Sequence, residues 1–299
     1  MRRNPPTNRS DFMTKTRAIA LSATLAALTL NVASAADEYQ WEAGLGFTQN
    51  TDDASNETTV TTIAANGEYH FLPVKLGDHP WEEAAFLEHS TFVEAHLGYV
   101  TAEDNTLDAS GPLIAVGFTY ATPEFPVRLS AGLGYSTVED GSFEIKTTVI
   151  ELEAGYWIKP ELIAGLRLVN SKSDFGTADE KEVGISAFGK WVFSMNDDLA
   201  FNTEAELGQN SYDNGSKDSN IVVGVAGDVY FRQQYGVGLS LASESGDAVG
   251  AEGMTVGVRA SSWFTDQIGA RVGYDMFAAS DDAAGVDDST ISLEVVGRF

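Results

Sequence analysis

The chain has 299 residues, no cysteine and a formal net charge of −26 at pH 7. The lack of cysteine excludes a disulfide framework and any thiolate metal site, and the excess of carboxylates excludes nucleic-acid phosphate as a partner. Beyond the first 35 residues, no apolar run reaches the roughly 20 residues that a membrane-spanning helix needs, so only strands could enter a membrane.

The first 35 residues have the parts of a secretory signal peptide. Lys15 and Arg17 precede a short apolar run that ends in small residues. This pattern predicts cleavage after Ala35, with Met13 as an alternative start of translation. An uncleaved membrane anchor is the other interpretation, but Ser and Thr interrupt the run. Removing the leader leaves 13 Lys+Arg against 43 Asp+Glu, so the exported chain is strongly acidic.

The remainder of the chain alternates apolar and polar residues in segments that are separated by polar breaks. Successive side chains of a strand point to opposite faces, so each segment is a ribbon with one apolar and one polar side. Most segments have the roughly 9 to 11 residues that a tilted strand needs to cross a bilayer. We count fourteen, with 12 or 16 as alternatives: 39–48, 59–71, 91–101, 112–121, 126–138, 143–158, 161–170, 182–194, 199–209, 220–231, 235–243, 253–264, 267–277 and 289–299.

The distribution of charged and aromatic residues distinguishes a membrane barrel from a soluble β-protein. Charged residues fall almost entirely on the polar side of the segments, and aromatic residues such as Trp41, Tyr99 and Phe201 gather near segment ends on the apolar side. Two aromatic belts that flank an aliphatic band are what a lipid-facing wall needs. We therefore predict an all-β fold, a single transmembrane antiparallel up-and-down barrel over residues 36–299.

The links between segments predict which way the barrel faces. Tight turns belong on the periplasmic side and longer loops outside, so the short links 122–125, 159–160, 195–198, 232–234 and 265–266 are expected to be periplasmic. The acidic links that alternate with them, such as 102–111 and 171–181, then face outward. The periplasmic link 72–90 is the exception, because Asp78 or His79 as a cap, Pro80 in the first turn and two glutamates predict a short helix there.

Two stretches carry a resemblance. The last segment ends the chain on Phe299 and resembles the closing strand of bacterial outer-membrane barrels, in which the assembly machinery recognises the final Phe. Residues 69–74 (Tyr-His-Phe-Leu-Pro-Val) and 80–87 (Pro-Trp-Glu-Glu-Ala-Ala-Phe-Leu) look like the general porin family of gammaproteobacteria. The resemblance implies a pore in the outer membrane of a Gram-negative cell, with lipid, lipopolysaccharide and the assembly machinery as partners.

The polar side of the ribbons supplies the candidate pore lining. Basic and acidic side chains on facing walls create a transverse field that sorts solutes by size and charge. The alternative is that they form cross-strand ion pairs that only fill the lumen. The predicted lining residues are Glu94, Arg128, Glu151, Glu153, Arg167, Lys190, Glu204, Glu206, Arg259, Arg271 and Asp275.

The acidic outward links predict a preference for cations. Carboxylates at a pore mouth, among them Asp53, Asp108 and Asp282, concentrate cations and repel anions, most strongly at low salt. They could instead keep the surface solvated or bind divalent cations that bridge lipopolysaccharide. No calcium-loop spacing, cofactor motif or paired base and nucleophile is visible, so we expect no metal, no cofactor and no enzymatic activity.

The functional prediction is a passive diffusion channel for small hydrophilic solutes. The first alternative is a structural or adhesive barrel whose lumen is plugged, with residues 81–87 as the natural plug. A transporter for apolar substrates is a third possibility, which the polar lumen disfavours.

Overall fold

The structure is a computed structural model that describes residues 38–52, 58–104, 108–141, 143–176, 179–196, 198–213, 217–246, 252–279 and 287–299. The predicted leader, its cleavage after Ala35 and the alternative start at Met13 lie outside these residues. Within the described part of the chain, no helix is long and apolar enough to span a membrane.

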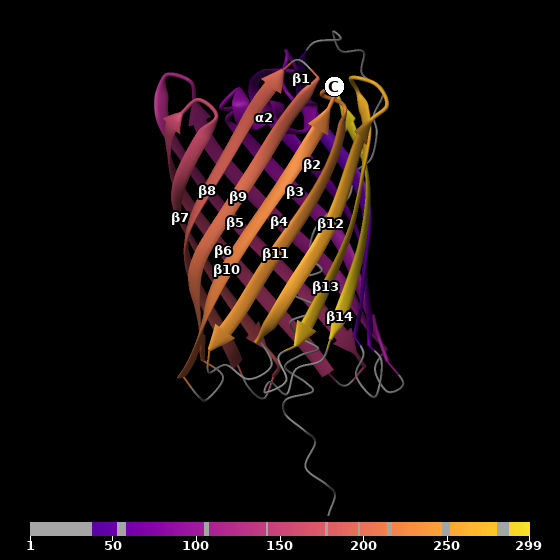
Figure 1. Ribbon diagram of the computed structural model, residues 1–299. Coiled ribbons are helices and arrows are strands. Elements are labelled where there is room, and N and C mark those ends of the chain that lie inside the picture. Colours follow the sequence, from indigo (N-terminus) through magenta and orange to yellow (C-terminus); the bar gives the residue numbers. More distant parts are fainter. Residues whose placement is uncertain are drawn as a thin grey trace, which may run out of the picture.

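Fourteen antiparallel strands form one closed barrel, in which β1 pairs with both β2 and β14 (Figure 1). The predicted all-β barrel of fourteen strands is confirmed, and the alternatives of 12 and 16 strands are wrong. The strands are β1 (Glu38–Asp52), β2 (Thr59–Lys75), β3 (Phe92–Glu103), β4 (Asp108–Thr122), β5 (Phe125–Asp140), β6 (Phe143–Lys159), β7 (Leu162–Asp174), β8 (Asp179–Asn196), β9 (Leu199–Asp213), β10 (Lys217–Phe231), β11 (Tyr235–Gly246), β12 (Gly253–Trp263), β13 (Ile268–Ala279) and β14 (Asp288–Arg298).

Most strands are longer than the alternation predicted, and the added residues lie mainly toward the acidic links. Strand β4 begins at Asp108 rather than at residue 112, and the β7–β8 hairpin continues to the pair Asp174 and Asp179. Backbone hydrogen bonding can continue along a hairpin after the apolar band has ended, and polar side chains there hide the alternation. The acidic links are therefore shorter than predicted.

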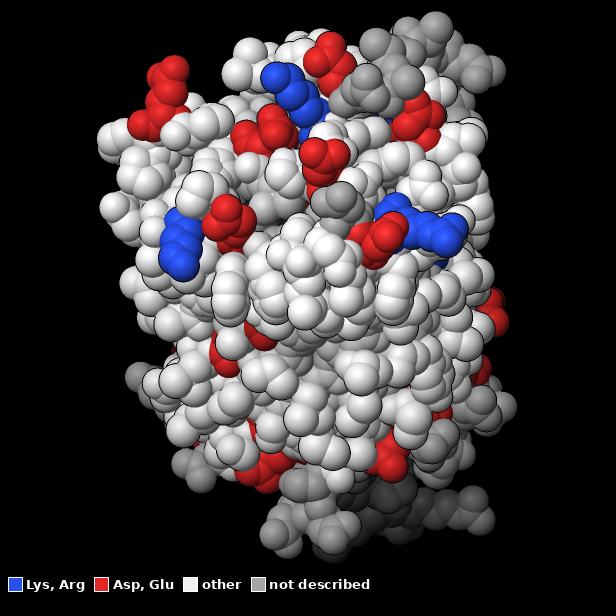
Figure 2. Space-filling view, turned by 45° about the horizontal axis from the view of Figure 1, so that its top comes forward, with Lys and Arg blue, Asp and Glu red and all other residues white. Residues whose placement is uncertain are grey.

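The barrel carries its aliphatic side chains on the outside. Leu97, Leu166 and Leu239 are each about 60% exposed, and the same side of the wall holds the other large exposed apolar residues. Figure 2 shows a largely uncharged belt around the visible face, with charged side chains gathered toward both ends. An apolar surface of this extent marks a wall that contacts lipid.

The two ends of the barrel differ. We call the end that carries the links 123–124, 160–161, 197–198, 232–234 and 264–267 the helix end, and the opposite one the loop end; they are at the top and bottom of Figure 1. Among the described residues, the four irregularities in strand register all lie at the helix end. Bulges are common at barrel rims, where they redirect side chains.

One of these irregularities corrects the predicted position of Tyr39. The sequence places Tyr39 on the apolar, outward side together with Trp41, but the register of β1 against β2 shifts between the two residues. Tyr39 is only 3% exposed and packs in a small core with Val74, Leu76 and Ala84. The aromatic belt at this rim is formed instead by Trp41 and the aromatic residues beside it.

The long link between β2 and β3 turns inward at the helix end. A 3-10 turn, η1 (Trp81–Glu83), leads directly into the short helix α2 (Ala84–Leu87), which confirms the predicted helix. The predicted cap is wrong, because Pro80 itself occupies the N-cap position and no side chain caps the helix. We call residues 76–90 the inturned segment (Figure 1).

Candidate pore and its charged lining

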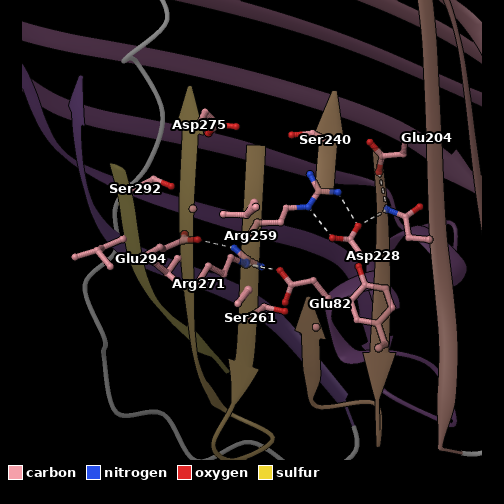
Figure 3. Close-up of a pocket in the computed structure, with 18 of the residues that line it drawn as sticks. Glu82, Glu204, Asp228, Ser240, Arg259, Ser261, Arg271, Asp275, Ser292 and Glu294 are labelled. Carbon is pink, nitrogen blue, oxygen red and sulfur yellow. Dashed lines mark hydrogen bonds and ion pairs between the residues drawn. The ribbon is translucent and has the colours of Figure 1, made fainter. Parts of the chain in front are cut away.

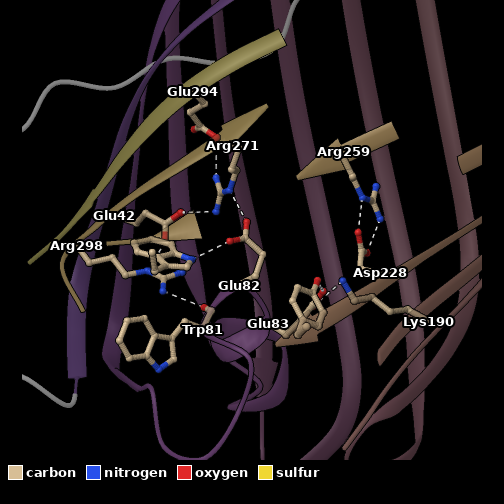
Figure 4. A network of polar contacts seen from close by, with 12 residues as sticks. Glu42, Trp81, Glu82, Glu83, Lys190, Asp228, Arg259, Arg271, Glu294 and Arg298 are labelled. Carbon is tan, nitrogen blue, oxygen red and sulfur yellow. Dashed lines mark hydrogen bonds and ion pairs between the residues drawn. The ribbon is translucent and has the colours of Figure 1, made fainter. Parts of the chain in front are cut away.

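The inturned segment is attached to the barrel wall through its two adjacent glutamates. The Glu82 carboxylate accepts hydrogen bonds from Trp263 Nε1 at 2.9 Å and from Arg271 Nε. The Glu83 carboxylate accepts one from the Tyr230 hydroxyl at 2.7 Å and pairs with Lys190 Nζ at 2.8 Å (Figure 4). These partners come from β8, β10, β12 and β13, so the segment reaches across the helix end.

Aromatic and backbone contacts hold the other parts of the segment. The His89 ring stacks on Trp157 with centroids 3.9 Å apart, and Phe86 packs on the same indole at 4.6 Å. The amide of Trp81 donates to the Gln233 carbonyl at 2.9 Å. The segment is therefore a folded part of the barrel that narrows its helix end.

A cluster of charged residues joins β1, β13 and β14 beneath this segment. The Arg271 guanidinium contacts Glu42 at 3.3 Å and Glu294 at 2.8 Å in addition to Glu82. Arg298 donates to Glu42 at 2.7 Å and to the Trp81 carbonyl at 2.9 Å. We call Glu42, Glu82, Arg271, Glu294 and Arg298 the segment cluster (Figure 4).

A second group of contacts lies beside the segment cluster. Arg259 on β12 binds both carboxylate oxygens of Asp228 at 2.6 Å, a paired geometry that fixes orientation as well as charge. This pair lies over Gly238 of the intervening strand β11. A Cβ atom at that position would lie 2.9 Å from Arg259 Nε and closer still to the Asp228 carboxylate. Glycine at this position leaves the room that the ion pair occupies.

A third group lies on the wall formed by β5 to β9 and involves no residue of the inturned segment. Arg167 contacts Glu151 at 3.2 Å, Glu153 at 3.0 Å and Glu206 at 3.2 Å. Arg128 adds a contact to Glu153 at 3.3 Å. We call Arg128, Glu151, Glu153, Arg167 and Glu206 the wall cluster.

Two cavities lie inside the barrel between these groups, one of about 550 Å³ (Figure 3) and one of about 360 Å³. Nine of the eleven predicted lining residues border them. The larger cavity is bordered by Lys190, Glu204, Arg259, Arg271 and Asp275, and the smaller by Arg128, Glu153, Arg167, Lys190, Glu204 and Glu206. The other two predicted residues pair with polar neighbours, Glu94 with His96 at 3.2 Å and Glu151 with Arg167.

The larger cavity also shows what the sequence prediction missed. Glu82 and Glu83 border it although they belong to a link, and Asp228 and Glu294 border it from the wall. With these residues the lining holds six carboxylates, including Glu204 and Asp275, against the three cations Lys190, Arg259 and Arg271. The sequence signal for Glu82 and Glu83 was the predicted helix with two adjacent glutamates, but periodicity carries no information about the direction in which a link folds.

The family comparison identifies the kind of protein. A family model described as "Putative general bacterial porin" matches residues 13–290. The chain belongs to this porin family. The predicted family is thereby confirmed, and a general bacterial porin is an outer-membrane channel protein. No curated protein matches the sequence.

Solved structures share the fold. The crystal structure of Omp33 from Acinetobacter baumannii is 20% identical, with a TM-score of 0.58 over 89% of this porin and 100% of that chain. A bacterial polysaccharide outer membrane secretin (8% identical, 89% and 100% covered) and a mutant of the TodX monoaromatic hydrocarbon channel (9%, 89% and 91%) each give a TM-score of 0.50. At these identities the likeness concerns the barrel and not what passes through it.

Proposed function

We propose that this porin is a passive diffusion channel for small hydrophilic solutes in the outer membrane of a Gram-negative cell, with a preference for cations. The observation that carries the proposal is the larger cavity inside the closed barrel, whose lining includes six carboxylates and three cations. An excess of one charge on narrow, low-dielectric walls raises the local concentration of ions of the opposite sign. The eleven predicted residues, Glu82 and Glu83 are the proposed lining.

Recording from planar bilayers tests this function. Purified protein should give steady conductance steps, and its reversal potential in a potassium chloride gradient should have the sign of cation selectivity. Wild-type protein that conducts with anion selectivity would refute the cation preference while leaving the channel in place. The absence of any conductance would refute the channel itself.

The inturned segment supports a second candidate, a structural barrel whose lumen is closed. Its contacts with Arg271, Lys190 and Trp157 reach different parts of the wall at the helix end. This candidate requires that the wild type does not conduct, and conductance that appears only after removal of the segment would identify the segment as the plug. A transporter for apolar substrates is disfavoured, because the inner contacts are ion pairs and hydrogen bonds between charged side chains.

The proposed partners follow from the surface. Lipid and lipopolysaccharide would cover the uncharged belt (Figure 2). The chain end would meet the assembly machinery, and its backbone is already paired with β1, since Phe299 donates to the Trp41 carbonyl at 2.8 Å. The acidic residues Asp53 and Asp282, which the sequence assigned to the outer mouth, lie outside the described residues.

A further inference from the structure

Two of the carboxylates in the larger cavity come from the inturned segment rather than from the barrel wall. Glu82 and Glu83 both border the cavity and belong to the segment at the helix end (Figure 4). The Glu83 side chain is 5% exposed and that of Glu82 is 18% exposed. Each accepts one contact from a neutral donor, Trp263 or Tyr230, and one from a cation, Arg271 or Lys190.

These two residues decide the charge balance of the cavity. Without them, the wall contributes four carboxylates against three cations, which is close to neutral. With them, the lining has three more carboxylates than cations. Because Glu82 and Glu83 border the larger cavity, a solute that crosses this cavity passes close to them.

The carboxylates at the loop end are too far from Glu82 and Glu83 to act on the ions that pass these two residues. Ala279 at the loop end lies eight positions after Arg271 on β13, roughly 26 Å along a strand. Charges in contact with water are screened over about 10 Å at 0.1 M salt. At moderate salt, the loop-end charges therefore act on ions at the mouth and not on ions beside the segment.

We propose that Glu82 and Glu83 determine the charge selectivity of this pore, and that the solutes they favour are small cations. This inference rests on the proposed channel function, and it assigns the selectivity to a link between strands rather than to the barrel wall or the outer mouth. Arg271 and Lys190 hold the two carboxylates in place and are partly neutralised by them.

The test compares reversal potentials of two matched double variants in planar bilayers at moderate salt. The variant E82Q/E83Q keeps an oxygen acceptor for Trp263 and Tyr230 while it removes two charges. Its cation-to-anion permeability ratio should fall about fivefold or more. The control E103Q/D108N removes two exposed charges at the loop end, where Glu103 and Asp108 face each other across the β3–β4 hairpin, and should leave the ratio unchanged.

Reversal of the two charges sharpens the test. In E82K/E83K the same cavity would have four carboxylates against five cations, so the pore should prefer anions. The single variants E82Q and E83Q should each change the permeability ratio by a smaller amount. They replace a double variant that does not fold. A cation-selective wild type whose E82Q/E83Q variant is unchanged overturns this inference alone. A wild type that is not cation-selective, or does not conduct, overturns the proposed function as well.

Discussion

The segment cluster and the wall cluster contain the same residue types but are assembled differently. Arg167 in the wall cluster binds Glu153 and Glu206, which are 14 and 39 positions away in the sequence. Arg271 in the segment cluster binds Glu82, which is 189 positions away. The wall cluster therefore forms whenever its neighbouring hairpins pair, whereas the segment cluster also needs the barrel closed and the inturned segment in place. The two clusters should respond differently when that segment is removed.

Deleting residues 76–88 should have the largest effect. The deletion removes Glu82, Glu83 and α2 from the helix end, so single-channel conductance should rise about threefold or more. It also removes Leu76 and Ala84 from the small core around Tyr39, which should lower the free energy of unfolding by about 2–5 kcal/mol. Planar-bilayer recording and urea unfolding of the refolded barrel measure the two quantities. Unchanged conductance would show that the segment does not narrow the path.

The contrast between Arg271→Met and Arg167→Met is more specific, because each variant removes a single cation and leaves the inturned segment in the chain. The two guanidinium side chains are almost equally exposed, at 30% and 32%. Loss of Arg271 leaves Glu294, which is 2% exposed, without its ion-pair partner, and should cost about 3–5 kcal/mol. Loss of Arg167 leaves Glu153 paired with Arg128, so about 1–2 kcal/mol is expected.

Repeating both substitutions in the barrel that lacks residues 76–88 separates the clusters. In that shortened barrel, Arg271→Met should lower the free energy of unfolding by less than it does in the wild type, because Glu82 is no longer present to lose its partner. The loss caused by Arg167→Met should stay the same. Equal costs for the two substitutions in the wild type, or equal changes after the deletion, would show that the clusters are not independent.

The contrast between the wall cluster and the segment cluster also explains how much of the fold and of the candidate site could be predicted from the sequence. Alternation of apolar and polar residues follows directly from strand geometry, so the fourteen strands and their two faces could be predicted from residue order alone. Tyr39 was misplaced because a bulge shifts parity without changing composition. The partners of Glu82 could not be predicted, because they depend on the direction in which a link folds. The members of the wall cluster could be predicted from the sequence as inward charges. Which of them pair could not, because the pairing depends on the register of β5 to β9.

Phe299→Ala should have the smallest effect on the folded barrel. The Phe299 carbonyl accepts hydrogen bonds from the Gln40 and Trp41 amides at 2.8 Å, and these backbone contacts do not depend on the side chain. The free energy of unfolding should therefore change by less than about 1 kcal/mol. If the assembly machinery recognises the aromatic side chain, the yield of folded barrel in cells should nevertheless fall severalfold, while refolding of purified protein into detergent proceeds as in the wild type. Equal losses in cells and in refolding would mean that the side chain matters for folding itself, because only the cellular route involves the machinery.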